Sequence, residues 1–266
     1  MGQASAAVVV DVHFALLEEL ADPGLQGEYQ GLLAADEAQR LGAMKLPARR
    51  LEYLCTRALC RTVLAAHTGA APTSLRFGAG PHGKPELVGP RDLPPIAFNL
   101  SNTAGLVACA VVAPQGPEPV VELGVDVEAL ARRSQLVPIA RRFFAPAEVA
   151  DLVALPEGGR RRRFFDYWTL KESYIKARGM GLSLPLSRFF FQLAPSGPPR
   201  IDFAPGFPDQ PGRWRFAQFA PTADHLGAVG VQTARPLAVR LHHVVPLRSP
   251  SLVNQSGDLR GPGQTP

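Results

Sequence analysis

The chain is poor in cysteine and has no long apolar run. Its three cysteines, Cys55, Cys60 and Cys109, are too few for a disulfide framework, and none lies at the C-x-x-C spacing of a metal site. No stretch approaches 18 uninterrupted apolar residues, which argues against a hydrophobic transmembrane helix. The first 20 residues lack the basic region of a signal peptide, and acidic residues come early in them. We therefore expect a soluble cytoplasmic protein in a reducing compartment, without a membrane partner.

The chain does have length, apolar content and an excess of positive charge. Its 266 residues are 46% hydrophobic, enough to fill a sizeable core. The formal net charge is +5, which suits an anionic partner such as nucleic acid, a phosphorylated cofactor or an acidic protein. Most single arginines are nevertheless expected on solvated helix faces. The arginines form pairs or runs at Arg49–Arg50, Arg132–Arg133, Arg141–Arg142 and Arg160–Arg163.

Hydrophobic periodicity predicts the same order of elements twice: a strand, then helices, then three strands. In the first half these elements cover residues 6–14, 35–44, 48–68, 74–77, 95–102 and 105–113. In the second half they cover residues 120–130, 136–144, 160–179, 188–193, 213–220 and 225–233. The repeated order predicts an α+β fold made of two similar halves.

A segment rich in proline and glycine, Ala113 to Pro119, is the expected boundary between the halves. We assign residues 1–118 to an N-terminal half and residues 119–245 to a C-terminal half that carries the candidate site. Residues 246–266 are polar, contain glycine and proline and show no periodicity, so they are expected to form a disordered tail.

Two acidic residues share one face of a predicted strand in the segment VVELGVDVE. The strand period of two places Asp126 and Glu128 on the face opposite Val125 and Val127. Two carboxylates on one face can reach a single hard cation, and Mg²⁺ prefers oxygen ligands. Gly124 leaves the start of that face uncrowded for a ligand. The alternative is an edge strand whose outward acids discourage aggregation.

The segment WTLKESYIKARG places Glu172 and Lys176 one helical turn apart. On a wheel at ~100° per residue, Glu172 falls about 40° from Trp168, inside an arc of mostly aromatic side chains. The other members of this arc are Phe164, Phe165, Ile175 and Gly179. A separate polar arc contains Asp166, Thr169 and Ser173.

The place of Glu172 in the aromatic arc needs a reason. A lone carboxylate on an apolar side is costly unless a cation or hydrogen-bond donors meet it. An exposed pair with Lys176 would contribute only about 0.3 to 0.5 kcal/mol, which does not explain the placement. A metal ion or a polyphosphate would explain it. On the helix alone, a half-buried salt bridge that holds the helix to its neighbour remains open.

Two further segments carry polar groups suited to phosphate. In GPHGKPEL, Gly83, Lys84 and Pro85 form a turn that can present backbone donors and a charge to an anion. In FNLSNTAG, Asn99 and Ser101 alternate with apolar residues, and the strand ends in a polar turn that begins at Asn102. Each segment alone is also consistent with an ordinary turn.

Taken together, the segments GKP, FNLSNT, GVDVE and WTLKESYIKARGMGLSLPL, in this order, resemble the Sfp-type 4′-phosphopantetheinyl transferases over roughly residues 45 to 195. The resemblance implies two α/β halves related by a pseudo-twofold axis, with coenzyme A and Mg²⁺ bound between them. It also implies the reaction, in which the phosphopantetheine arm of coenzyme A moves to a serine of an apo carrier protein and adenosine 3′,5′-bisphosphate is released.

The resemblance also assigns roles to individual residues. In the family, the acids of G-V-D-V-E bind Mg²⁺, which maps to Asp126 and Glu128. The glutamate of W-x-x-K-E completes the metal site and helps to deprotonate the serine, which maps to Glu172. The later lysine contacts the phosphates and aids the leaving group, which maps to Lys176. Such chemistry is coherent, because attack on a diphosphate depends on positioning and charge neutralisation, and serine needs a base.

The remaining implied contacts concern coenzyme A. Lys84 and Pro85 of the G-K-P turn are expected near the adenosine, and Ser101 and Asn102 near the phosphates. The family's second motif usually ends in histidine where this chain has Asn102, which can donate a hydrogen bond but brings no charge. Positive charge for the 3′-phosphate is expected on the long helix, at Arg50 and Arg57.

The partners implied are acidic carrier proteins or carrier domains of fatty-acid, polyketide or peptide synthases, steered by the arginine-rich surface of a monomeric enzyme. One rival is a nucleic-acid-binding protein, suggested by the basic charge and by the segment GRRRRFFDYW, but no recognised nucleic-acid module is present. A second rival is a magnesium-dependent phosphohydrolase that uses the same carboxylates. We expect neither a nucleic-acid nor a membrane partner.

Overall fold

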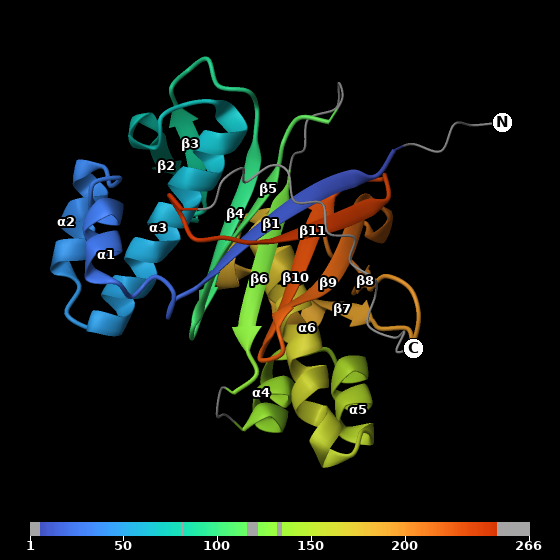
Figure 1. The fold of residues 1–266 in the computed structure, drawn as a ribbon. Coiled ribbons are helices and arrows are strands. Elements are labelled where there is room, and N and C mark those ends of the chain that lie inside the picture. Colours follow the sequence, from blue (N-terminus) through green and yellow to red (C-terminus); the bar gives the residue numbers. More distant parts are fainter. Residues whose placement is uncertain (1–5, 81, 116–121, 132–134, 249–266) are drawn as a thin grey trace, which may run out of the picture.

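The computed structural model describes residues 6–80, 82–115, 122–131 and 135–248 and has a mixed α/β fold (Figure 1). The helices are α1 (Pro23–Gln30), α2 (Ala35–Ala43), α3 (Pro47–Thr68), α4 (Leu136–Phe143), α5 (Pro146–Ala154) and α6 (Glu157–Arg178). The strands are β1 (Val8–Leu16), β2 (Arg76–Ala79), β3 (Pro85–Gly89), β4 (Ala97–Thr103), β5 (Leu106–Val112), β6 (Leu123–Ala129), β7 (Phe189–Gln192), β8 (Arg200–Phe203), β9 (Trp214–Thr222), β10 (His225–Gln232) and β11 (Leu237–His243).

Two sheets lie at the centre of the molecule. One has the strand order β11-β1-β5-β4 and the other β6-β10-β9, and two hairpins, β2-β3 and β7-β8, lie beside them (Figure 1). In the first part of the chain, the opening strand β1 pairs with β5, which comes after helices α1 to α3. In the second part, the opening strand β6 pairs in the same way with β10, which comes after helices α4 to α6. The predicted order of strand, helices and strands recurs, with four strands in place of the three expected.

The closing strand β11 lies against the opening strand β1. The two strands run parallel, in a register that pairs Val8 with Leu237 and Phe14 with His243. β11 was not predicted, and neither were α1, α5, β3 and β8. β1 thus has a partner on each side, which leaves no unpaired edge on that strand.

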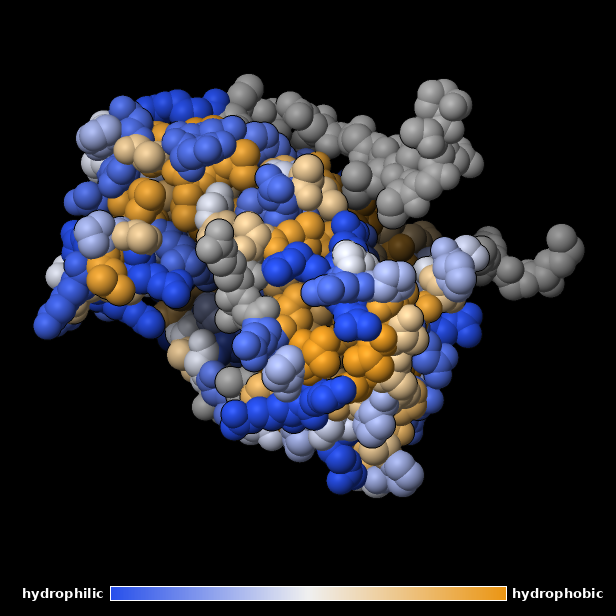
Figure 2. All heavy atoms as spheres, turned by 90° about the horizontal axis from the view of Figure 1, so that it is seen from below, coloured by the Kyte–Doolittle hydropathy of each residue, from blue (hydrophilic) through white to orange (hydrophobic). Residues whose placement is uncertain are grey.

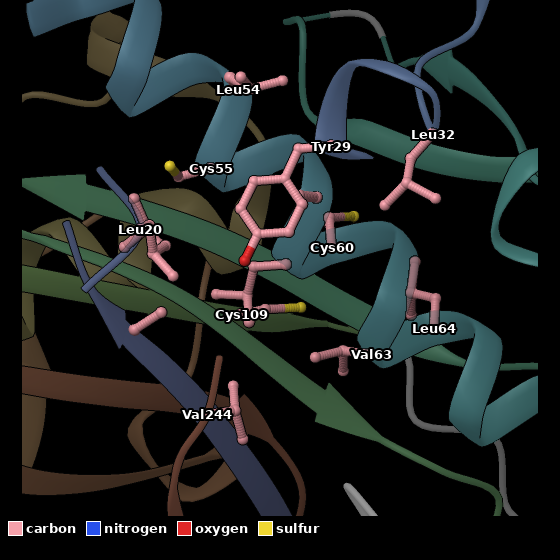
Figure 3. Close-up of a cluster of buried hydrophobic side chains, with 14 of the residues drawn as sticks. Leu20, Tyr29, Leu32, Leu54, Cys55, Cys60, Val63, Leu64, Cys109 and Val244 are labelled. Carbon is pink, nitrogen blue, oxygen red and sulfur yellow. The ribbon is translucent and has the colours of Figure 1, made fainter. Parts of the chain in front are cut away.

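Three apolar clusters hold the elements together. The first packs α1 and α3 on the sheet of β1 and β5; Figure 3 shows Tyr29, Cys60 and Cys109 in it, and Tyr29 donates a hydrogen bond to the carbonyl of Pro246 (3.1 Å). The second is rich in aromatic residues and packs α4, α5 and α6 against β7 to β10. The third lies between the two sheets and includes Val125 and Val127, which therefore face the core as predicted.

Some predicted features fall outside the described residues. These are the arginine pair Arg132–Arg133, the boundary between residues 118 and 119, and residues 249–266 of the expected tail. Pro246 to Arg248, at the start of that expected tail, are described, and Arg248 forms an exposed ion pair with Glu28. No described helix is both long enough and apolar enough to cross a membrane.

Candidate active site

The candidate site lies where β4 of one sheet meets β6 of the other. Asn99, Ser101 and Thr103 of β4 accept hydrogen bonds through their side-chain oxygens from the backbone N–H groups of Val125, Val127 and Ala129 in β6, at 3.0, 3.2 and 3.2 Å. The other edge of β6 is paired with β10. These side chains, of which Ser101 was expected near a phosphate, thus satisfy the N–H groups of a strand edge, as buried N–H groups require.

Helix α6 lies directly on β6. A Cβ atom at Gly124 would clash with the carbonyl oxygen of Ser173 and the amide nitrogen of Ala177, so only glycine permits this approach. The sequence interpretation of Gly124 as room for a ligand is corrected here, because the helix itself fills that space. The close approach brings the side chains of α6 over the carboxylates of β6.

The polar arc of α6 is also corrected. Thr169 and Ser173 are fully buried against the sheet, and their hydroxyls donate to carbonyls of their own helix, those of Phe165 and Leu170 (both 2.8 Å). Small hydroxyl-bearing side chains can pack closely when the helix satisfies their hydrogen bonds. Small size, and not contact with water, therefore explains the place of Thr169 and Ser173 in that arc.

Lys176 connects the two sheets at the site. Its ammonium donates to Asp126 Oδ1 (2.7 Å) and to the hydroxyl of Ser101 (2.8 Å), and that hydroxyl donates to the same carboxylate oxygen (3.0 Å). Burial raises the pKa of Asp126, and the bonds from Lys176 and Ser101 oppose the rise. The second oxygen, Oδ2, is buried and has no hydrogen-bond partner. One carboxylate oxygen is thus committed to the protein, and the other remains available to a ligand.

Glu172 lies one turn before Lys176, and among the described residues no hydrogen bond or ion pair joins their side chains. Burial, followed by repulsion from Asp126 and Glu128, raises the pKa of Glu172 to about 7, and the nearby charge of Lys176 lowers it in part. A carboxylate with such a pKa can both accept and release a proton near neutral pH. The sequence was therefore correct that Glu172 needs an explanation other than a simple ion pair with Lys176.

Two pockets lie at the site. The first has a volume of about 310 Å³ and joins the G-K-P turn to α6; it is lined by His82, Gly83, Lys84, Pro85, Asn99, Leu100, Glu172, Ile175, Lys176, Gly179 and Gly181. The second has a volume of about 470 Å³ and is lined by Arg49, Glu52, Asn102, Thr103, Ala104, Glu128, Ala129 and Ala131. Residues far apart in the sequence thus converge around β6, which carries Asp126 and Glu128.

Asn102, which replaces the expected histidine, is held by α3. Its amide donates to Glu52, and Glu52 also pairs with Arg49 at 2.7 Å. The second pocket therefore contains the carboxylates of Glu52 and Glu128 as well as the guanidinium of Arg49. Sequence reasoning missed Glu52 and Arg49, because a helix 50 residues earlier gives no local signal of contact with Asn102.

Arg50 and Arg57 line neither of these pockets. Arg50 donates to the carbonyls of Leu41 (2.6 Å) and Met44 (3.3 Å) at the end of α2. Arg57 is buried, pairs with Glu37 and lies over the ring of Phe77, 4.4 Å from its centroid. Both guanidinium groups are engaged within the N-terminal part of the chain.

The predicted metal ligands are near one another but are not arranged as a ligand set. Repulsion from Asp126 and from Glu128 contributes to the raised pKa of Glu172. Within the described residues, however, no group of three or more histidine, cysteine, aspartate or glutamate side chains is placed so that it could hold a metal ion. The acidic cluster is present, and Lys176 is the cation bonded to it.

The arginine run at the start of α6 is engaged inside the chain. Arg160 and Arg161 donate to backbone carbonyls, Arg162 pairs with Asp166 (3.2 Å), and Arg163 pairs with Asp151. On the face seen in Figure 2, hydrophilic and hydrophobic residues are interspersed. Each of these four arginines thus has an acceptor within the chain, while the side chains of Arg161 and Arg162 are exposed.

Comparison with known proteins identifies the family of the chain. The family model of the 4′-phosphopantetheinyl transferase superfamily matches residues 122–229, which include β6 and α6. The 4′-phosphopantetheinyl transferase HetI of Nostoc sp. is 31% identical over 199 residues, which are 75% of this chain and 78% of HetI. The 4′-phosphopantetheinyl transferase Sfp of Bacillus subtilis is 34% identical over 54% of this chain and 59% of its own length.

A solved structure, the holo-[acyl-carrier-protein] synthase of Thermotoga maritima, aligns with a TM-score of 0.35 and 21% identity over 44% of this chain and 65% of its own. The chain belongs to the 4′-phosphopantetheinyl transferase superfamily, as the length and identity of the match with HetI show. The resemblance drawn from the four motifs is confirmed, and so is the class of enzyme, a transferase of 4′-phosphopantetheine.

Proposed function

We propose that this transferase takes 4′-phosphopantetheine from coenzyme A and attaches it to a serine hydroxyl of an apo acyl or peptidyl carrier protein, with Mg²⁺ required and adenosine 3′,5′-bisphosphate released. The observation that carries the proposal is the arrangement on α6. Glu172 and Lys176 both line the first pocket, and Lys176 is bonded to Asp126. A base and an ammonium beside one pocket are the groups that transfer from a diphosphate needs.

The residues proposed to hold Mg²⁺ are Asp126, Glu128 and Glu172, whose side chains would have to move together on binding, since no three such acids among the described residues are placed to hold one ion. They offer only oxygen donors, which Mg²⁺ prefers, and the buried Oδ2 of Asp126 has no hydrogen-bond partner. Repulsion from Asp126 and Glu128 contributes to the raised pKa of Glu172, and a cation would relieve it. When bound, the ion supplies neutralisation of the negative charge on the diphosphate.

In the proposed mechanism, Glu172, whose side chain lines the first pocket, accepts the proton of the attacking serine. Lys176 places its ammonium on the phosphate oxygens and stabilises the charge of the departing adenosine bisphosphate. Ser101 holds that ammonium in place through its hydroxyl. The reacting groups are thus oriented by β4, β6 and α6 together, as proximity catalysis requires.

Coenzyme A is proposed to occupy the first pocket and to extend toward the second. Pro85 and the aliphatic stem of Lys84 form part of the wall of the first pocket, on the side of the adenosine. Asn102 lines the second pocket with Arg49, an exposed arginine that can meet a phosphate there. The sequence assignment of the 3′-phosphate to Arg50 and Arg57 stays a prediction, and their internal contacts make Arg49 the first residue to test beside them.

We also propose that the chain consists of two similar halves, residues 1–118 and 119–245, related by a pseudo-twofold axis. The equivalent strand orders β1-β5-β4 and β6-β10-β9 support this proposal. The proposed acceptor is an acidic carrier protein or carrier domain of a fatty-acid, polyketide or peptide synthase, bound by a monomeric enzyme. The net charge of +5 supports an acidic partner.

The test is a transfer assay against a panel of apo carriers. The purified protein, coenzyme A and Mg²⁺ should raise the intact mass of at least one carrier by one phosphopantetheine group, and a chelator should stop the reaction. Glu172→Gln and Asp126→Ala should each lower the rate by about 10³-fold, because they remove the proposed base and a proposed metal ligand. A chain that modifies none of the carriers would refute the proposed function.

Glu157→Gln is the matched control, because it makes the same chemical change at an exposed position on the same helix. It should retain the wild-type rate. Thermal unfolding of all three variants checks that the fold is intact. Wild-type rates in both Glu172→Gln and Asp126→Ala would overturn the site while leaving the family unchanged.

A further inference from the structure

Lys84 of the G-K-P turn makes contacts that the sequence did not suggest. Its ammonium donates to the carbonyl oxygen of Ala177 (2.9 Å), in the last turn of α6, and to that of Leu123 (3.0 Å), the first residue of β6. An ammonium has three donors, so two of them are committed to backbone carbonyls. The side chain thus connects the β2-β3 hairpin with the end of the helix and the start of the strand that carry the site.

The end of α6 is a place where such a donor matters. The last four carbonyls of a helix lack partners within the helix, and a positive charge there is also favourable toward the helix dipole. Ala177 is one residue before the end of α6 at Arg178, and the chain then turns at Gly179 with φ +60°. A Cβ at Gly179 would lie 3.3 Å from Cδ of Lys84, so the lysine stem also packs on this turn.

Both carbonyls are next to the catalytic groups in sequence. Ala177 follows Lys176, whose ammonium is bonded to Asp126, and Leu123 lies three residues before Asp126. Between these two points the helix touches the strand at Gly124, with no side chain intervening. The ammonium of Lys84 therefore fixes the end of α6 relative to the start of β6. The relative position of these two segments sets the distance from Lys176 to Asp126.

We propose that Lys84 is a positioning residue for Lys176: its ammonium holds the last turn of α6 on the first residues of β6, and so sets Lys176 against Asp126 and the substrate phosphates. The proposal rests on the proposed function, since it concerns the same reaction. It differs from the interpretation of the G-K-P lysine as a ligand of coenzyme A. On this view the stem of Lys84 lines the pocket, while its charge serves the protein.

Steady-state kinetics separate the positioning role of Lys84 from a role as a ligand of coenzyme A. The acceptor is one apo carrier that the wild-type protein modifies. Lys84→Met keeps the stem and removes the donors. It should lower kcat by about 10-fold to 10²-fold, because small misplacement of a catalytic group costs rates of this size, with the Kd of coenzyme A changed less than twofold. Lys84→Arg, which keeps charge and donors, should recover part of kcat. A rise of tenfold or more in the Kd of coenzyme A with kcat unchanged would show a phosphate ligand and overturn the proposal, as would unchanged values of both.

Amide hydrogen exchange gives a readout that does not depend on activity. In the full-length protein without substrate, Lys84→Met should speed exchange in the last turn of α6, residues 175–178, relative to the first turns of the same helix. Lys45→Met, at an exposed lysine, is the matched control and should change neither exchange nor kcat. Equal exchange in wild type and Lys84→Met would refute the positioning role. A wild-type protein inactive on all carriers would refute the proposed function instead, and this exchange test would still stand.

Discussion

Two lysines that lie five residues apart on α6, Lys171 and Lys176, each pair with a buried carboxylate of another element. The two pairs differ in how many of their polar atoms have hydrogen-bond partners. Lys171 donates to Glu148 (2.8 Å) and to the carbonyls of Leu186 (2.8 Å) and Phe189 (2.7 Å). Lys176 donates to Asp126 and Ser101. The side chains of Lys171 and Glu148 are 0% and 1% exposed, whereas that of Lys176 is 27% exposed.

The carboxylates show the same difference. Glu148 accepts from Lys171 and from the backbone N–H groups of Ala145 (3.0 Å) and Phe191 (2.9 Å), so both of its oxygens are bonded. Asp126 has one oxygen, Oδ2, that is buried without a hydrogen-bond partner. A completed network of this kind stabilises the fold, whereas a buried polar atom left unpaired carries a cost that a ligand can remove. The incomplete pair therefore indicates the site, and the complete pair indicates structure.

The largest expected effect is on the complete pair. Burial lowers the pKa of Lys171 to about 8 and raises that of Glu148, while the mutual attraction of the pair opposes both shifts. Lys171→Met leaves Glu148 buried without its cation, and we expect the free energy of unfolding to fall by about 3 to 5 kcal/mol. Urea denaturation measures this loss. The double variant Lys171→Met with Glu148→Gln should recover part of it, and a loss below about 1 kcal/mol in the single variant would contradict the assigned structural role.

The incomplete pair should respond in activity. Lys176→Met is expected to lower kcat about 10²-fold, equivalent to about 2.7 kcal/mol in the barrier, because the phosphates lose their ammonium. Stability should fall less than in Lys171→Met, since the side chain of Lys176 is 27% exposed and donates to two acceptors, whereas that of Lys171 is 0% exposed and donates to three. Transfer kinetics and urea denaturation on the same samples compare the two pairs directly. Equal loss of stability in both variants, with wild-type kcat in Lys176→Met, would remove the distinction.

The contrast also shows what could be predicted from the sequence. The period of two in β6 correctly separated Val125 and Val127 from the two carboxylates, because sheet geometry depends only on alternation. The wheel placed Glu172 among apolar side chains, and burial is the first cause of its raised pKa, while its role in the site stays a prediction. The wheel failed at Thr169 and Ser173, because hydropathy does not report which polar side chains are small enough to be buried with their hydrogen bonds made to their own helix. The hydrogen-bond partners of Lys84 are backbone carbonyls, and the residue types of Leu123 and Ala177 give no sign of such a contact.

The missed elements have similar causes. β11 pairs with β1 in parallel, so its partner lies 229 residues away and no hairpin turn marks it. α1 begins with Pro23 and Gly24 and contains Gly27, residues that lower the helical signal although proline suits the first turn. Local patterns therefore predicted the strands and helices whose own sequence is amphipathic. The missed elements depend on contacts with distant parts of the chain, which local patterns do not show.

Another buried polar group, far from the site, has no hydrogen-bond partner among the described residues. His13 of β1 is fully buried, stacked on His242 of β11 with 4.6 Å between ring centroids, and edge-on to His67 near the end of α3 at 5.8 Å. Both of its ring nitrogens lack hydrogen bonds. The carboxylate of Asp11, which contacts His242 at 2.8 Å, is the charged group facing the cluster. Burial, then repulsion from His242 and His67, lowers the pKa of His13 to about 3, and Asp11 opposes this in part.

His13 gives the smallest of these effects and a defined pH dependence. Its pKa is lower in the folded protein than the ordinary 6.5, so the unfolded chain binds the proton first, and stability falls as pH drops from about 6.5 toward 3. Between pH 7.5 and 5 the loss due to His13 should be about 2 kcal/mol. Urea denaturation at both pH values should show this loss in wild type and in the control His82→Asn, at an exposed histidine, but not in His13→Leu. An unchanged pH dependence in His13→Leu would mean that the imidazole is satisfied in the folded protein, as Glu148 is and Asp126 is not.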